Sequence, residues 1–95
     1  MFVQIVQFES TLSKEELMAV ARKRLPQYKA KPGLLQKYYI KGSKPNHYGG
    51  VYIWDSMESL EANRESDLAK SIPNEYKVVG QPSVEIHEAV IQLRE

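Results

Sequence analysis

Two segments in the middle of the chain are apolar on both of the faces that a β-strand presents. They are residues 34–40 (LLQKYYI) and residues 48–54 (YGGVYIW). Successive side chains of a strand point to opposite sides of the sheet, so a half-buried strand alternates apolar and polar positions. In residues 48–54 the tyrosines and the tryptophan fall on one side, whereas Val51 and Ile53 fall on the other. The pattern predicts a sheet that is covered on both faces.

The rest of the chain can cover only one of these two faces. An antiparallel sheet normally leaves its second face to water, where polar side chains are expected. A second copy of the chain is the simplest source of another apolar cover. We therefore predict a homodimer in which the two sheets face each other.

The N-terminal half adds a strand and an amphipathic helix. Residues 2–8 alternate as a strand, and Ser13 and Glu16 have the spacing of a capping box that begins a helix. The inner stripe of this helix is predicted to consist of Leu17, Val20, Ala21 and Leu25, with Arg24 beside them. Pro26 lacks an amide donor and is expected to end or kink the helix near Leu25.

The C-terminal half contains a second helix and a last strand. Asp55 or Ser56 is predicted to cap the helix, and its inner side is predicted to carry Met57, Leu60, Arg64 and Leu68. Residues 69–83 contain Pro73, Gly80 and Pro82 and are expected to form turns, with a short helical piece near Leu68. Residues 84–93 are predicted to be the last strand. A change of apolar parity at Glu88 indicates a bulge, or a strand that moves to another sheet.

The order of these elements predicts an α+β fold. Strand–helix–strand–strand–helix–strand (βαββαβ) is the ferredoxin-like order, with a four-stranded antiparallel sheet and both helices on one face. Ninety-five residues suffice for one domain, so residues 1–95 are expected to form a single domain. Two such sheets facing each other would form a dimeric α+β barrel.

Composition and charge exclude several function classes. The absence of cysteine excludes disulfides, a thiolate nucleophile and cysteine-based zinc sites, and it is consistent with a cytoplasmic protein. Residues 1–50 hold nine basic and three acidic side chains, but a pI of about 7.9 is low for a nucleic-acid binder. No segment reaches the roughly 20 apolar residues of a membrane span. We expect neither nucleic acid nor membrane as a partner.

Several of the segments described above resemble a known family. Pro32-Gly33-Leu34-Leu35, Lys37 and the run from Asn46 to Trp54 are similar to the YdhR-type monooxygenases of the dimeric α+β barrel, or antibiotic biosynthesis monooxygenase, superfamily. The similarity is strongest over residues 31–63. It implies a homodimer that oxidises a small aromatic or enolic substrate with O₂ and uses no metal, flavin or other cofactor. A non-catalytic dimer that binds or senses a small hydrophobic or aromatic molecule is the main alternative. A dimerisation module whose cavity is filled by its own side chains is the third.

Cofactor-free oxygenation requires a flat apolar pocket, a base and donors for a developing oxyanion. Tyr38, Tyr52 and Trp54 combine aromatic surface with a polar group, so they are candidate substrate-binding residues, and packing in the core or the interface is the alternative. His87 lies in the middle of a predicted strand, where a neutral imidazole is a candidate general base. A hydrogen-bonded structural histidine is the alternative.

Three further residues are candidates in or near turns. His47 is a second candidate base or donor, and Asn46 beside it is a candidate substrate-binding residue of the same turn. Arg64 shares a predicted helix face with Leu60 and is a candidate partner for an anionic oxygen, although its side chain could extend to the surface instead. The two histidines have no acidic partners at ligand spacing, so no metal site is predicted.

Overall fold

The computed structural model describes residues 1–94, which form one antiparallel sheet and four helices. The strands are β1 (Phe2–Ser10), β2 (Leu34–Lys41), β3 (His47–Trp54) and β4 (Val78–Glu88). The helices are α1 (Lys14–Lys29), α2 (Met57–Arg64), α3 (Asp67–Lys70) and α4 (Ile72–Glu75). The strand order is β2-β3-β1-β4, and every neighbouring pair is antiparallel. The predicted ferredoxin-like α+β class is confirmed.

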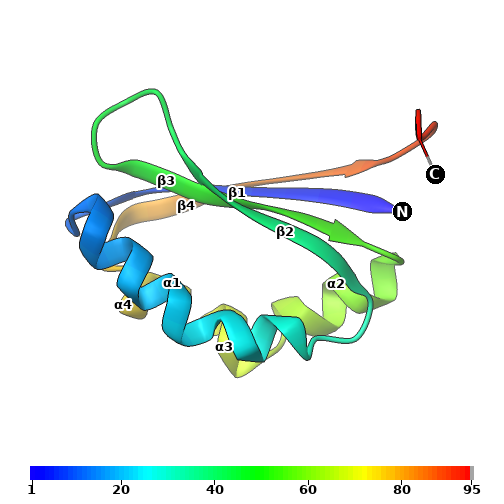
Figure 1. Ribbon diagram of the computed structural model, residues 1–95, viewed down its shortest axis with the longest axis horizontal. Coiled ribbons are helices and arrows are strands. Elements are labelled where there is room, and N and C mark those ends of the chain that lie inside the picture. Colours follow the sequence, from blue (N-terminus) through cyan, green and yellow to red (C-terminus); the bar gives the residue numbers. More distant parts are fainter. Residues whose placement is uncertain (95) are drawn as a thin grey trace.

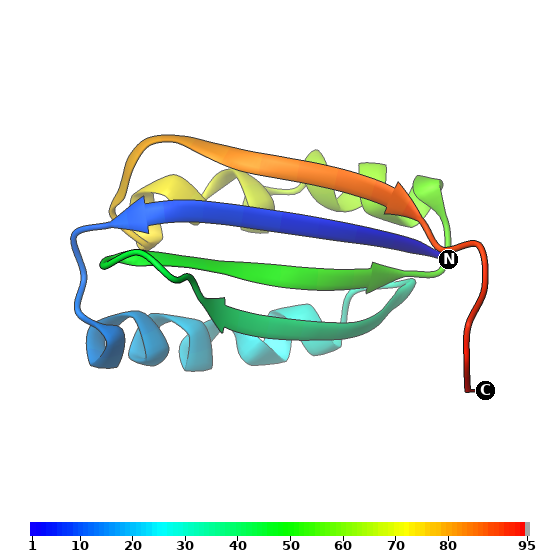
Figure 2. The same cartoon turned by 90° about the horizontal axis from the view of Figure 1, so that it is seen from above.

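All four helices lie on the same side of the sheet (Figure 1). Seen from above, α1 runs beneath the β2 side, whereas α2, α3 and α4 follow one another beneath the β4 side (Figure 2). The molecule therefore has two layers, and the space between them is bounded by α1 on one side and by α2–α4 on the other. No helix among residues 1–94 is long and apolar enough to cross a membrane.

The register of the strands assigns each side chain to one face of the sheet. Partners across an antiparallel ladder share a face, so Val6, Gly50 and Val84 point toward the helices. The buried core is formed on this helix-covered face, and its least exposed members are Trp54 and Leu60. The other face, which we call the open face, has no helix over it. Its apolar side chains are Val3, Ile5, Tyr38, Ile40, Val51 and Ile53.

Helix α1 begins as predicted but ends later. Ser13 Oγ accepts a hydrogen bond from the Glu16 amide at 3.2 Å, and Glu16 Oε1 accepts one from the Ser13 amide at 2.9 Å, which confirms the capping box. The expected end near Leu25 is wrong, because the helix continues through Pro26 to Lys29. Pro26 is exposed, so water can satisfy the carbonyl that lacks its amide partner.

The segment after β3 contains three short helices where one longer helix and turns were expected. Ser56 caps α2 by accepting from the Ser59 amide at 3.2 Å, and Ser66 caps α3 by accepting from the Ala69 amide at 3.2 Å. Helix α4 ends at Glu75, and Ser10 Oγ donates to the carbonyl of the following Tyr76 at 2.6 Å. This last bond joins the helical layer to the end of β1.

The predicted bounds of the last strand, 84–93, are wrong at both ends. Strand β4 begins at Val78 and includes Gly80 and Pro82, which lie at a register shift between the pairs Ser83–Gln7 and Val79–Glu9. The bulge is therefore at this point, and Gly80 adopts a φ of 72°, which glycine tolerates easily. At Glu88, where a bulge or a change of sheet was expected, the strand simply ends.

Candidate functional site

Charged and phenolic side chains gather in the space between the sheet and the helices. Arg24 and Tyr28 come from α1, Lys37 and Tyr39 from β2, Tyr52 from β3, and Tyr76 from the end of α4. We call these six residues the interlayer cluster. Four of them are at most 7% exposed, namely Arg24, Tyr28, Tyr52 and Tyr76. A cationic group buried to this degree is uncommon in a protein core, so the cluster is a candidate functional site.

The local structure explains why these side chains point inward. Leu17, Ala21, Arg24 and Tyr28 recur at intervals of three and four residues and form the buried stripe of α1. A register shift in β2 near Leu34 places Lys37 opposite Tyr52 on the helix-covered face. Each cluster residue is therefore held by a regular element rather than by a flexible loop.

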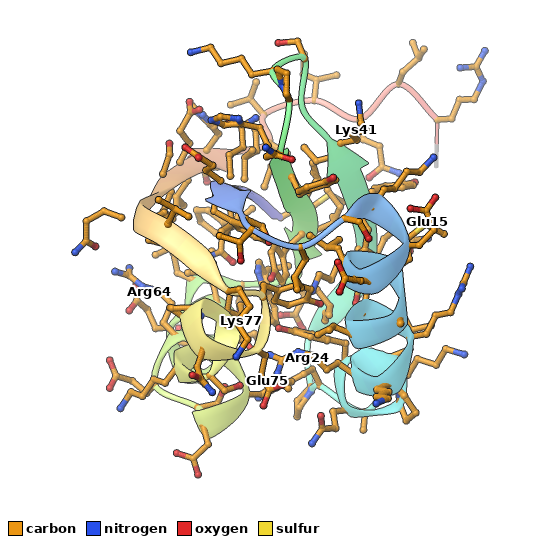
Figure 3. The ribbon with its side chains drawn as sticks, turned by 90° about the vertical axis from the view of Figure 1, so that its left-hand side faces the viewer. Glu15, Arg24, Lys41, Arg64, Glu75 and Lys77 are labelled. Atoms are coloured by element: carbon orange, nitrogen blue, oxygen red, sulfur yellow. The ribbon has the colours of Figure 1, made fainter. Side chains whose placement is uncertain are left out.

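Arg24 crosses the space between the helices without meeting a carboxylate. Its Nη1 donates to Ser71 Oγ at 2.9 Å, and its Nη2 donates to the Leu68 carbonyl at 2.6 Å. Figure 3 shows Arg24 between α1 and the chain that leads to α4. No carboxylate among residues 1–94 forms an ion pair with it, and its Nε has no hydrogen-bond partner. The guanidinium retains charge and a donor for a negatively charged oxygen.

Lys37 is enclosed by aromatic rings. Its Nζ lies 3.4 Å from the Tyr28 ring centroid and 4.4 Å from those of Tyr39 and Tyr52. We call these three rings the aromatic cage. Burial, and secondarily the positive charge of Arg24, lower the pKa of Lys37 to about 7. A substantial fraction of the side chain is therefore a neutral amine near neutral pH, which can accept a proton.

Three tyrosines of the cluster, Tyr39, Tyr52 and Tyr76, keep their protons. Burial raises the pKa of Tyr39 to about 12, and it raises the pKa of Tyr52 and Tyr76 well above the ordinary value. These hydroxyls are consequently donors at neutral pH and not bases. The buried hydroxyls of Tyr28 and Tyr76 have no hydrogen-bond partner. Buried polar groups are nearly always paired, so these unpaired hydroxyls are candidate donors to a ligand's oxygen atoms.

Two hollows flank the interlayer cluster. The β2-side groove has a volume of 280 Å³ and lies between α1 and β2, with Tyr28, Lys29, Lys37 and Tyr39 in its wall. The β4-side cavity has a volume of 190 Å³ and lies between β1, β4 and α2–α4. Tyr52 lies between them, because its ring belongs to the aromatic cage and also lines the cavity.

Three of the residues predicted from the sequence lie on the helix-covered side of the sheet. Tyr52 is 3% exposed and belongs to the interlayer cluster. Trp54 is fully buried and donates its Nε1 hydrogen to Gln4 Oε1 at 3.0 Å, so its polar group is already paired. Arg64 lines the β4-side cavity but extends outward and pairs with Glu61 at 3.1 Å (Figure 3). The buried Oδ1 of Asn63, beside Arg64, has no partner.

The other four predicted residues lie outside the interlayer cluster. His87 is exposed on the open face, 3.3 Å from Glu85, and Tyr38 is 57% exposed on the same face. Asn46 and His47 lie in the β2–β3 hairpin, where Asn46 has a φ of 63° and His47 Nδ1 is 2.8 Å from the Pro45 carbonyl oxygen. The structure does not bring the two histidines together with Tyr52. Their catalytic roles stay predictions.

The sequence interpretation missed most of the cluster, namely Arg24, Tyr28, Lys37, Tyr39 and Tyr76. A signal was present for Arg24, because it continues the helical spacing from Leu17 and Ala21 although it is charged. Lys37 is likewise a charged residue in the middle of a mostly apolar strand. Residues 1–94 contain no group of three or more His, Cys, Asp or Glu side chains that could hold a metal ion.

Comparison with known proteins supports the fold. No family model matches the chain, and no curated protein does. A Nitrosomonas europaea protein of unknown function, NE2512, is 16% identical with a TM-score of 0.80, and the match covers 99% of this chain and 93% of that one. A Caulobacter crescentus CB15 protein described as a proposed antibiotic biosynthesis monooxygenase is 19% identical with a TM-score of 0.78, covering 95% and 90%.

SnoaB from Streptomyces nogalater, described as a cofactor-independent oxygenase, is 12% identical with a TM-score of 0.77, and the match covers 99% of this chain and 97% of that one. The chain thus has the fold of antibiotic biosynthesis monooxygenase proteins. At these identities the likeness concerns the fold alone, because one fold hosts many functions.

Proposed function

We propose that the chain is a cofactor-independent monooxygenase that oxidises a small aromatic or enolic molecule with O₂. The observation that carries the proposal is the interlayer cluster, in which Arg24 Nε and the hydroxyls of Tyr28 and Tyr76 are buried without partners and without a carboxylate. Such a site favours a ligand oxygen that carries or develops negative charge, as the oxygen of a phenol or enol does when it loses its proton. That change of charge is the first requirement of oxygenation without a metal or flavin.

The residues of the cluster have separate roles in this proposal. Arg24 and the tyrosine hydroxyls stabilise the negative charge that develops on the substrate oxygen, because their donors are already oriented in a dry environment. The ring of Tyr52, which lines the β4-side cavity, provides a flat surface for an aromatic ring. The substrate anion is the reductant of O₂. One oxygen atom enters the substrate and the other leaves as water with the substrate's two hydrogens.

The size of the hollows and the known proteins support the same proposal. Volumes of 190 and 280 Å³ are below the roughly 300–1,000 Å³ of pockets for drug-sized ligands, which favours a small substrate. SnoaB, which shares the fold, is described as a cofactor-independent oxygenase. We extend this description to the present chain as a proposal.

We also propose that the protein is a homodimer joined through the open face. That face carries six apolar side chains and no helix, and the C-terminal residues Val90, Ile91 and Leu93 are each at least 85% exposed. A second copy would cover this surface. The non-catalytic binding or sensing dimer remains the alternative function, and the same experiment tests it.

The test is O₂ consumption by metal-stripped protein in the presence of hydroxylated anthrones and naphthols. We expect uptake with at least one substrate, a loss of at least tenfold in Arg24→Gln, and full activity in the control Arg22→Gln, which changes an exposed arginine of the same helix. Binding of an aromatic ligand in a thermal-shift assay without any O₂ uptake would instead support the sensing alternative.

A further inference from the structure

The β2-side groove combines apolar surface with positive charge. Its wall contains three leucines, two tyrosines, one glutamine and two lysines, and it contains no acidic residue. Lys29 lies at the last turn of α1, and Lys37 rises from β2. A groove of this composition matches a small apolar molecule that carries, or can form, one negative charge.

The amine of Lys37 is the polar group that the aromatic cage encloses in this groove. Three ring centroids lie within 4.4 Å of Nζ, and Lys37 itself lines the groove. Among residues 1–94 no carboxylate pairs with this amine. A lysine without a counter-ion loses its proton readily when it is buried, and ring faces stabilise the ammonium when it forms. The geometry therefore permits both protonation states.

We propose that Lys37 is the proton acceptor of the β2-side groove, and that it removes the hydroxyl proton of a small planar phenol or enol. This inference rests on the proposed function and goes further, since it selects one of the two hollows and names the base. The lone pair of Nζ takes the proton, the O–H bond breaks, and its electron pair stays on the substrate oxygen. A neutral amine and a neutral phenol become an ammonium and a phenolate, with no oxidant or reductant involved.

The groups around Nζ favour this transfer. Arg24 and Tyr28 face it from α1, Tyr39 from β2, and Tyr52 from β3, with Tyr76 beyond Arg24. None of these groups offers a second base, because the pKa values of Tyr39, Tyr52 and Tyr76 are raised and arginine stays protonated. The pKa of Lys37, lowered to about 7, matches that of an acidic phenol. Lys29 adds a positive charge to the groove that holds the product anion.

The test uses 4-nitrophenol, whose phenolate absorbs visible light and whose neutral form does not. The bound probe is titrated with acid and base in the wild type, in Lys37→Met and in the control Lys41→Met. Lys41 lies on the same strand and the same face as Lys37 but is exposed. We expect the wild type and Lys41→Met to lower the pH at which the probe ionises by about one unit, and Lys37→Met to remove this effect.

A measurement without ligand keeps the inference testable even if Lys37→Met folds poorly. The Cε and Hε chemical shifts of Lys37 in the wild type should titrate near neutral pH. Lys37 chemical shifts that do not change near neutral pH, no probe binding in the wild type, or an unchanged probe spectrum in Lys37→Met each overturns the inference. Probe ionisation that depends on Lys37 without any O₂ consumption leaves the base in place and rejects the monooxygenase. O₂ consumption that is unchanged in Lys37→Met supports the monooxygenase and rejects Lys37 as its base.

Discussion

Arg24 and Lys37 are two basic side chains on the inner side of the sheet, and neither has an acidic partner. In most proteins such groups are paired, because a buried charge without a counter-charge is destabilising. Here hydrogen bonds to Ser71 and Leu68 offset part of the cost of burying the Arg24 guanidinium, and aromatic rings surround Lys37. A sequence that retains both residues gives up stability, which is the usual property of a functional site.

The position of Tyr52 leads to a prediction about turnover. Tyr52→Phe removes one buried donor and keeps the ring, so O₂ consumption should fall about tenfold while the circular dichroism spectrum stays unchanged. His87→Ala is the informative comparison, because His87 lies on the open face. If His87→Ala abolishes turnover and Tyr52→Phe does not, the reaction takes place on the open face and the interlayer site is wrong.

The lowered pKa of Lys37 leads to a prediction about stability and pH. The unfolded chain holds the lysine proton up to about pH 10.5, whereas the folded protein releases it at about pH 7. Between these values the unfolded state binds more protons, so the free energy of unfolding rises with pH. Lys37→Met removes this dependence and should stabilise the protein by about 1–3 kcal/mol near pH 6, with a smaller gain near pH 10.

Urea unfolding at the two pH values, at one protein concentration, measures this difference. Lys41→Met is the matched control, because it changes an exposed lysine of the same strand. Equal effects of Lys37→Met at both pH values would show that the amine keeps its proton in the folded protein.

The sequence could indicate only part of the candidate site. Tyr52 was identified because an aromatic residue with a polar group in a buried strand is recognisable by type and position. Lys37 was not identified as a site residue, because its environment depends on α1 and β3, which are distant in sequence. The placement of His87 on the open face likewise depends on its pairing with Val3. Which side chains of separate elements meet depends on the strand register and on the rotation of each helix about its axis. A local sequence pattern reveals neither.

At the scale of elements, the pairing of β1 with β3 depends on a close approach at Gly49. A Cβ atom there would lie 2.0 Å from the Val6 carbonyl oxygen, whereas one at Gly50 would lie 3.2 Å from a Tyr52 ring carbon and 3.3 Å from Lys37 Cε. The two neighbouring glycines therefore have different roles. Gly49 permits the strands to pair, and Gly50 leaves space for the interlayer cluster.

This difference predicts a larger loss of stability for one of two adjacent substitutions than for the other. Gly49→Ala should destabilise the protein by about 3 kcal/mol or more, because backbone atoms cannot move aside without separating the strands. Gly50→Ala should cost less, about 1 kcal/mol, but should alter the environment of Lys37 and its titration. Thermal unfolding measures the first effect, and the Lys37 chemical shifts measure the second. Similar losses of stability in both variants would contradict this assignment.

Elements with strong local signals were predicted well, and those that depend on tertiary structure were not. The capping box at Ser13 and the strand pattern of 48–54 are local, and the structure confirms the capping box and a strand over His47–Trp54. The continuation of α1 through Pro26 depends on that residue's exposure, which its sequence neighbours do not reveal. The early start of β4 depends on β1, which pairs with Val78 and Val79 across a bulge that Gly80 and Pro82 accommodate.

At the scale of the whole molecule, the surface is too large for a compact monomer. A monomer of 10.9 kDa is expected to expose about 5,600 Å². The structure exposes 6475 Å², and the excess of roughly 900 Å² resembles the about 800 Å² that each partner buries in a standard interface. The open face and the C-terminal residues contribute to this excess, and a second copy would remove it.

The proposed dimer predicts a specific response to charge on the open face. Val51 lies in the middle of this face, so Val51→Glu should weaken association by about 2 kcal/mol or more, which is roughly thirtyfold in the dissociation constant. Met18→Glu changes an exposed residue of α1 and is the control. Multi-angle light scattering over a dilution series gives the dissociation constants of the wild type and of both variants. A wild type that remains monomeric at high concentration would refute the dimer.

The interlayer cluster is assembled from α1, β2, β3 and α4 of a single chain, on the side of the sheet away from the open face. If two chains associate through the open face, each carries a complete reaction centre that needs nothing from its neighbour. Inactive Arg24→Gln subunits exchanged into wild-type assemblies should then lower the rate in simple proportion to their share. Saturation curves should be hyperbolic, because neither chamber has a physical means of sensing the other.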